Sequence, residues 1–131
     1  PTLGTKIYSY SDQFFGTASR MLNENSPIFK EHVYDKNGKW MDGWETRRKR
    51  IKGNDFCIIK LGKTGKVSVV EIDTSFFNGN QPEFASIEGC YANKFGDVYW
   101  NIHSIGKWSI THQAICRCKW PLIRHKIESD A

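Results

Sequence analysis

The sequence predicts an all-β protein of one domain, built as a sandwich or a barrel. Short apolar runs recur about every 8–12 residues and are separated by turn-forming residues, which is typical of such folds. Aromatic residues make up 14% of the chain, a composition that favours strands over helix bundles. The 131 residues can form one hydrophobic core, and no internal repeat or linker divides them. We therefore expect a single domain over residues 1–131.

The N-terminal third is expected to hold a strand, a helix and a turn. Lys6–Tyr10 alternates as a strand does. Phe14–Leu22 has apolar residues at helical spacing, and Ser11 with Asp12 can cap its start. The polar, proline-containing segment that follows ends this short helix. Lys36–Lys39 contains an Asn-Gly pair, which is a strong signal for a hairpin turn.

The remainder of the chain is predicted to consist of strands. Phe56–Leu61 is a mostly apolar strand, and turn-forming residues follow it at Gly62–Lys66. Val67–Phe77 is a long run of β-forming residues that ends at Asn78-Gly79-Asn80. Four further strands are expected at Phe84–Tyr91, Val98–Ile105, Ala114–Cys116 and Leu122–Ile127.

The net charge of +5 permits an acidic partner without requiring one. The basic run Arg47–Lys52 has two interpretations. It is either a site that binds an anion or a solvated loop or strand end. The acids Asp42, Glu45 and Asp55 are interleaved with this run and argue against nucleic-acid binding. No apolar run approaches the ~20 residues of a membrane span, and the start lacks a secretory pattern. We expect a cytoplasmic protein without a nucleic-acid or membrane partner.

The four cysteines are expected to be reduced, structural thiols. Cys57 lies in an apolar strand and is interpreted as a small buried hydrophobic residue. Cys116 and Cys118 form a C-x-C pair, and with Cys90 and the scattered histidines they fit no tetrahedral zinc template. We therefore predict no metal and no cofactor.

The segment Trp40–Arg48 brings chemically useful groups together. Within nine residues it holds two carboxylates, two guanidiniums and two indoles. Arginine binds carboxylates in a bidentate manner, and a glutamate beside arginines can act as a general acid or base. The alternative is an ion-pair network with aromatic packing.

The segment Glu71–Asn80 is the second candidate. Strand alternation places Glu71, Asp73 and Ser75 on one face. The asparagines that follow can donate hydrogen bonds to a urea group and accept hydrogen bonds from it. The alternative is an exposed polar face that ends in a turn.

These segments resemble the allantoicase family. The resemblance is close from Gly4 to Tyr91, roughly two-thirds of the chain, and is weak over the divergent tail 92–131. The segments that match the family's blocks are Tyr10–Phe15, Gly38–Arg50, Asp55–Gly62, Glu71–Asn80 and Ser86–Glu88.

The resemblance implies a hydrolase of purine catabolism that converts allantoate to ureidoglycolate and urea. It also implies a jelly-roll β-sandwich of the galactose-binding type, of which this chain resembles the first of two family repeats. The alternatives are a non-catalytic jelly-roll module that binds a small polar ligand, or an inactive single-repeat fragment.

The family's final strand has no match after Ala131, and its loss would leave an unpaired sheet edge. We therefore expect marginal stability or self-association as a homo-oligomer.

The matched positions supply the site residues, and side-chain chemistry suggests their roles. Because neighbouring strand residues point to opposite faces, only one of two consecutive arginines is expected to face the pocket. The predicted set comprises Glu45 and Asp73 as acid and base, Arg47 and Arg48 for the substrate's carboxylate or ureido oxygens, Asn78 and Asn80 for the ureido arms, and Trp44 as a pocket wall.

Overall fold

A computed structural model describes residues 4–63, 70–82, 84–92, 98–109, 113–116 and 122–128. Strands dominate these residues, and the one helix among them is short, which confirms the prediction of an all-β protein. No helix within this part of the chain is long and apolar enough to cross a membrane.

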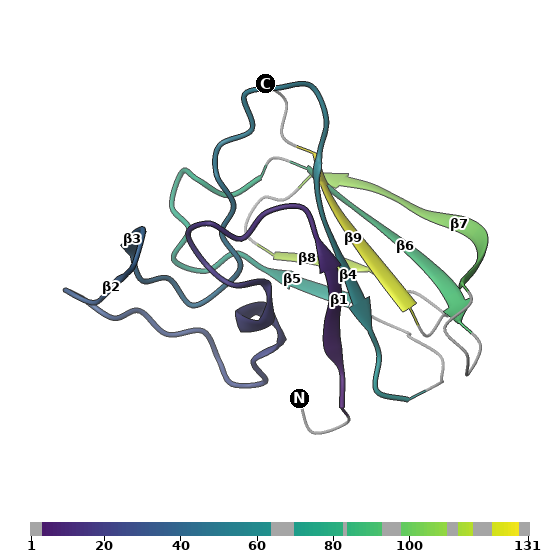
Figure 1. The fold of residues 1–131 in the computed structure, drawn as a ribbon, viewed down its shortest axis with the longest axis horizontal. Coiled ribbons are helices and arrows are strands. Elements are labelled where there is room, and N and C mark those ends of the chain that lie inside the picture. The colour runs from purple at the N-terminus through teal and green to yellow at the C-terminus, as the bar shows by residue number, and fades with distance from the viewer. Residues whose placement is uncertain are drawn as a thin grey trace.

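A five-stranded antiparallel sheet forms the body of the molecule (Figure 1). Its strands, in spatial order, are β1 (Lys6–Tyr10), β4 (Asp55–Lys60), β9 (Leu122–Glu128), β6 (Phe84–Ala92) and β7 (Val98–Ser109). The strand β9 comes from the divergent tail and pairs with β4 on one side and β6 on the other. The tail therefore contributes an inner strand of this sheet.

Two small antiparallel sheets accompany the large one. The strands β2 (Tyr34–Asp35) and β3 (Gly38–Lys39) form a hairpin at the predicted place. The turn is Lys36-Asn37 alone, since Gly38 and Lys39 already belong to β3. The strands β5 (Val70–Asp73) and β8 (Gln113–Cys116) form the other sheet. Figure 1 shows the β2–β3 hairpin projecting to one side of the large sheet, beyond the short helix.

Alternation along the strands places small apolar side chains inside the molecule. Cys57 on β4 and Ala85 on β6 are fully buried, as is Ala18 in the helix. Burial raises the pKa of the Cys57 thiol to about 11, so the thiol stays protonated and behaves as a hydrophobic residue. This confirms the interpretation of Cys57, whereas the side chains of Cys90, Cys116 and Cys118 lie outside the described part.

The predicted helix over Phe14–Leu22 is wrong in extent. Only Ala18–Leu22 is helical, and it forms the 3₁₀ helix η1. The residues before it are held extended because Gly16 forms a β-bridge with Glu45. Gln13 Oε1 accepts the backbone N–H of Ala18, the first residue of η1, at 3.2 Å.

The predicted strand over Val67–Phe77 is shorter than expected. Residues 67–69 lie outside the described part, and β5 ends at Asp73. There Asp73 Oδ1 accepts the backbone N–H of Ser75 at 2.8 Å, a local contact that turns the chain away from the strand. Phe76 then adopts a φ of +69°, in the left-handed region. The common polar face therefore includes Glu71 and Asp73 but not Ser75.

Candidate functional site

Glu45 is fixed through its backbone to the segment that precedes the helix. Its N–H donates to the Gly16 carbonyl at 3.1 Å, and its own carbonyl accepts the Gly16 N–H at 3.0 Å and the Phe15 N–H at 3.2 Å. Gly16 is buried, and a Cβ atom at this position would lie 2.7 Å from the Gly43 carbonyl oxygen. The close approach that holds Glu45 therefore requires glycine at position 16.

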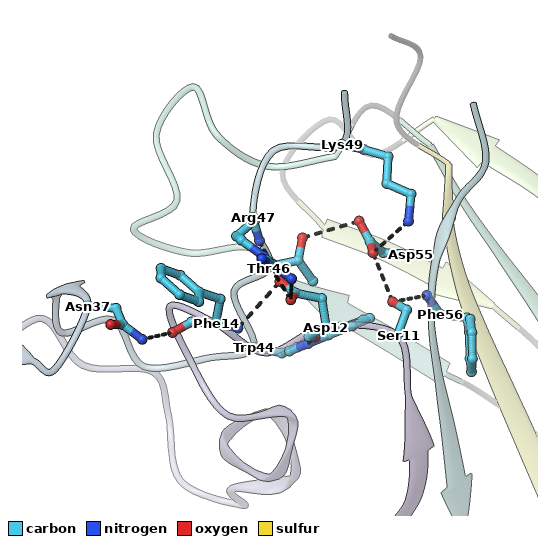
Figure 2. A network of polar contacts seen from close by, with 10 residues as sticks. All are labelled: Ser11, Asp12, Phe14, Asn37, Trp44, Thr46, Arg47, Lys49, Asp55 and Phe56. Carbon is cyan, nitrogen blue, oxygen red and sulfur yellow. Dashed lines mark hydrogen bonds and ion pairs between the residues drawn. The ribbon is translucent and has the colours of Figure 1, made fainter. Parts of the chain in front are cut away.

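The neighbours of Glu45 along the chain are bound in a polar network (Figure 2). The Trp44 indole N–H donates to the Asp12 carbonyl at 2.7 Å, and the Thr46 hydroxyl lies 3.3 Å from Asp55 Oδ2. We call this set of contacts, which involves Ser11, Asp12, Trp44, Thr46, Arg47, Lys49 and Asp55, the Asp12–Asp55 network.

Asp12 binds both the backbone and the side chain of Arg47. Its Oδ1 accepts hydrogen bonds from Arg47 Nε at 3.1 Å and Nη2 at 2.8 Å, and its Oδ2 accepts the Arg47 backbone N–H at 2.7 Å. The guanidinium also lies 5.2 Å from the centre of the Phe14 ring. Partial burial acts to raise the pKa of Asp12. The hydrogen bonds from Arg47 and from the Phe14 N–H, together with the Arg47 charge, outweigh it and hold the pKa below its ordinary value.

Asp55 is the buried acid of the network, with 5% of the residue exposed. Its Oδ1 accepts the Ser11 hydroxyl at 2.8 Å and lies 3.4 Å from Lys49 Nζ. The Ser11 oxygen in turn accepts the Phe56 backbone N–H at 3.0 Å. The network thus joins the segment after β1, the start of β4 and the segment that carries Glu45.

The Glu45 side chain meets a different set of groups. Glu45 Oε1 accepts a hydrogen bond from Asn80 Nδ2 at 3.2 Å. Arg20 and Asp35 lie close enough for their charges to act on the Glu45 carboxyl. We call Arg20, Asp35, Glu45 and Asn80 the Glu45 cluster.

The surroundings of the Glu45 carboxyl shift its pKa upward. Burial raises the pKa of Glu45 above its ordinary value of 4.5, and the charge of Asp35 acts in the same direction. The Asn80 hydrogen bond and the Arg20 charge oppose this rise without cancelling it. A half-buried carboxyl with a raised pKa is a stronger base than an ordinary surface glutamate.

Arg20 and Asp35 form an ion pair beside Glu45. Arg20 Nη1 lies 2.6 Å from Asp35 Oδ2 and donates to the Met41 carbonyl at 3.1 Å. The Asp35 oxygen is buried and makes no hydrogen bond in the described part of the chain, so this contact is an ion pair only. The guanidinium carbon of Arg20 lies 5.5 Å from the centre of the Trp40 ring. Arg20 therefore connects η1, β2 and the segment that leads to Glu45.

The structure brings together two of the seven predicted site residues, Glu45 and Asn80. Trp44 and Arg47 belong to the Asp12–Asp55 network instead. Arg48 and Asn78 are exposed. Asp73 is also exposed, and its recorded hydrogen bond goes to Ser75 rather than to the Glu45 cluster.

Sequence reasoning missed Arg20, Asp35 and Asp55 as site residues. Arg20 stands in a run with helical periodicity, and Asp35 stands beside a predicted turn. The two residues pair across 15 positions, which is not a local spacing of a helix or a strand. Asp12 was interpreted only as a helix cap. Its carboxylate accepts the Phe14 N–H at 3.4 Å, but no helix begins there, and its shorter contacts are with Arg47. No group of three or more potential metal ligands occurs among the described residues.

Comparison with known proteins identifies the family. The sequence model of the allantoicase repeat matches residues 1–123. A probable allantoicase of Acinetobacter baylyi is 59% identical over 90 residues. That alignment covers 69% of this chain but 27% of the relative, so the chain matches about a quarter of that protein's length.

Solved structures agree with the sequence comparison. Allantoicase from Saccharomyces cerevisiae superposes with a TM-score of 0.76 at 29% identity, over 98% of this chain and 42% of the yeast chain. The C-terminal domain of a chitobiase from Bacteroides fragilis superposes with a TM-score of 0.50 at 17% identity, over 94% of this chain and 80% of that domain. The second likeness concerns the fold alone.

Proposed function

The chain belongs to the allantoicase family, and we propose that it hydrolyses allantoate to ureidoglycolate and urea at the Glu45 cluster. The observation that carries the proposal is the half-buried Glu45 carboxyl, whose pKa is raised and which accepts a hydrogen bond from Asn80 beside the Arg20 guanidinium. The proposal includes a cytoplasmic location and self-association. It also includes a jelly-roll sandwich of the galactose-binding type, which the non-consecutive antiparallel order β4-β9-β6 supports.

The substrate's chemistry sets three requirements. Allantoate has a central carbon that carries one carboxylate and two ureido groups. The carboxylate must be held, water must be deprotonated as it attacks, and the departing nitrogen must gain a proton. A carboxyl, an amide and a guanidinium together can meet all three requirements.

Glu45 can perform both proton transfers. As the general base it takes a proton from water while the water oxygen bonds to the central carbon. The bond from that carbon to one ureido nitrogen breaks, and the departing nitrogen receives the proton from Glu45. One water is consumed, one urea leaves, and Glu45 returns to its starting state. Asn80 holds the Glu45 carboxyl in place for these transfers.

The other predicted residues keep proposed roles at the edge of the site. Trp44 is a pocket wall, and the bond from its indole to Asp12 supports this role by fixing the ring. Asp73 is a second group for proton transfer, and Asn78 orients a ureido arm. Of the two consecutive arginines, Arg48 contacts the ureido oxygens, because the Arg47 fork is occupied by Asp12.

A non-catalytic binding module is the second candidate. The observation that favours it is coverage, because the chain matches only 27% of the length of the Acinetobacter baylyi relative. A chain of this kind can retain the ligand-binding groups while lacking residues that lie elsewhere in a longer protein.

Urea release from allantoate tests the proposal. We expect the parent chain to release urea and Glu45→Gln to release it about 10²–10³-fold more slowly, because an amide cannot accept the proton of water. Glu31→Gln is the matched control, since the Glu31 side chain is 76% exposed. Equal rates for the parent and Glu45→Gln would remove Glu45 from the reaction. Allantoate binding without urea release by the parent would favour the binding module.

A further inference from the structure

Arg20 is held rigidly beside Glu45. Its side chain is 21% exposed, and Nη1 is occupied by the Asp35 carboxylate and the Met41 carbonyl. The guanidinium also contacts the Trp40 ring. These contacts come from β2 and from the segment after β3, so the orientation of the guanidinium is set before any ligand binds. A preorganised cation loses little conformational freedom when it binds a ligand.

The remaining edge of the Arg20 guanidinium is available to a ligand. Its Nε and Nη2 make no hydrogen bond to the residues that the structure describes. These two nitrogens form the fork that binds both oxygens of a carboxylate in parallel. The corresponding nitrogens of Arg47 both donate to Asp12 Oδ1. Arg20 therefore offers an open fork, whereas the fork of Arg47 is occupied.

The position of Arg20 matches the position of the substrate's charge. In allantoate the carboxylate is attached to the carbon at which the C–N bond breaks. The group that binds this carboxylate must therefore lie next to the group that transfers protons. Arg20 acts electrostatically on Glu45, whereas Arg47 and Arg48 do not contribute to the pKa shift of Glu45.

From this geometry we infer that Arg20 binds the substrate's carboxylate through its Nε and Nη2 and thereby makes the site specific for anionic ureides. This inference rests on the function proposed above. Asp35 is a positioning residue, since it contacts Arg20 at Nη1, the nitrogen that is not part of the Nε–Nη2 fork. Trp40 supports the guanidinium through its ring.

The inference is tested by binding of two small ligands that differ only in charge. N-carbamoylglycine carries one ureido group and a carboxylate, and its primary amide is neutral. Titration calorimetry gives the affinity of each ligand for the parent chain, Arg20→Gln, Arg20→Lys and the control Arg50→Gln. We expect the parent and Arg50→Gln, which changes an exposed arginine, to prefer the anion by about 10-fold to 100-fold, the range typical of a charged hydrogen-bonded pair.

The variants separate charge from geometry. Arg20→Gln should lose the preference for the anion while its affinity for the amide changes little. Arg20→Lys should keep part of the preference, because it retains the charge without the fork. This partial rescue also shows that the site remains folded. The inference would be overturned if the preference persists in Arg20→Gln, if it is lost in Arg50→Gln, or if the parent shows none.

Binding requires no turnover, so the two proposals can fail separately. A parent chain that prefers the anion through Arg20 but releases no urea from allantoate would contradict the proposed hydrolysis and retain Arg20 as the anion-binding residue. A parent chain that releases urea with an unchanged anion preference in Arg20→Gln would do the reverse.

Discussion

Glu45 is held on both sides along the chain while its carboxyl points to separate partners. Trp44 and Thr46 are bound by the Asp12–Asp55 network, and the Glu45 backbone pairs with Gly16. These constraints place the carboxyl in a half-buried position, where the charged form is disfavoured. A surface glutamate with free neighbours would relax into water and keep an ordinary pKa.

The raised pKa of Glu45 predicts a pH dependence of stability. Below 4.5, the ordinary pKa, Glu45 is protonated in both the folded and the unfolded chain. As the pH rises from there through the folded pKa, the unfolded chain loses its proton first, so the folded state is progressively disfavoured. Glutamine stays neutral throughout. The unfolding free energy of Glu45→Gln minus that of the parent should therefore increase over this window and then level off.

Urea denaturation at several pH values measures this difference. Glu31→Gln provides the reference, since Glu31 is largely exposed. A difference between Glu45→Gln and the parent that stays flat, or that shrinks as the pH rises, would contradict the raised pKa.

Site residues that stand in conspicuous polar segments were predictable, and residues that join the site only through contacts between elements were not. Glu45 and Asn80 stand in segments whose polar groups are visible in the sequence. Arg20 reaches the site through an ion pair with Asp35 that forms only when η1 and β2 come together. Local spacing carries no information about such a contact, and Asp12 was misread as a cap for the same reason.

At the scale of elements, the bridge between Gly16 and Glu45 joins the segment before η1 to the segment that carries the site. Gly16→Ala would place a methyl group 2.7 Å from the Gly43 carbonyl oxygen, a backbone atom that cannot move aside freely. We expect a loss of about 1–3 kcal/mol in unfolding free energy, as for other overpacked positions. We also expect slower urea release, because Glu45 would shift.

Chemical denaturation and the urea assay check this prediction together. Ser19→Ala is the matched control, since Ser19 is exposed on η1. Unchanged stability and activity in Gly16→Ala would show that the bridge does not hold the site in solution.

The strands were predictable because alternation is a local signal that burial reinforces. Lys6–Tyr10 matches β1, and the predicted strands near β4 and β9 agree with the structure to within a residue or two. The helix over Phe14–Leu22 failed because pairing between Gly16 and Glu45 overrides helical spacing in that segment. Pairing between distant segments depends on the whole fold and leaves no local pattern.

At the scale of the molecule, buried Asp55 connects three separate segments. It accepts hydrogen bonds from Ser11 and Thr46 and pairs with Lys49. Asp55→Ala would leave two part-buried hydroxyls without their acceptor and should lower the unfolding free energy by about 2–3 kcal/mol. Thermal unfolding measures the effect, with Glu31→Ala as the exposed control. Equal melting temperatures for the two variants would contradict a stabilising role of the network.

The strand order was not predictable from the sequence. The tail strand Leu122–Glu128 was expected, but its place between β4 and β6 depends on pairing across most of the chain. The resemblance to allantoicase implied a sandwich without fixing which strands are neighbours. The inner position of β9 follows from the structure alone.

The most direct test of the Glu45 cluster as the site is an NMR titration of Glu45→Gln with allantoate, in which slow turnover preserves the ligand. We predict that the Arg20 Nε–H and Asn80 side-chain amide signals shift and saturate together at one affinity. Shifts confined to the Arg47 and Arg48 Nε–H signals, with those of Arg20 and Asn80 unchanged, would contradict the assignment of the site.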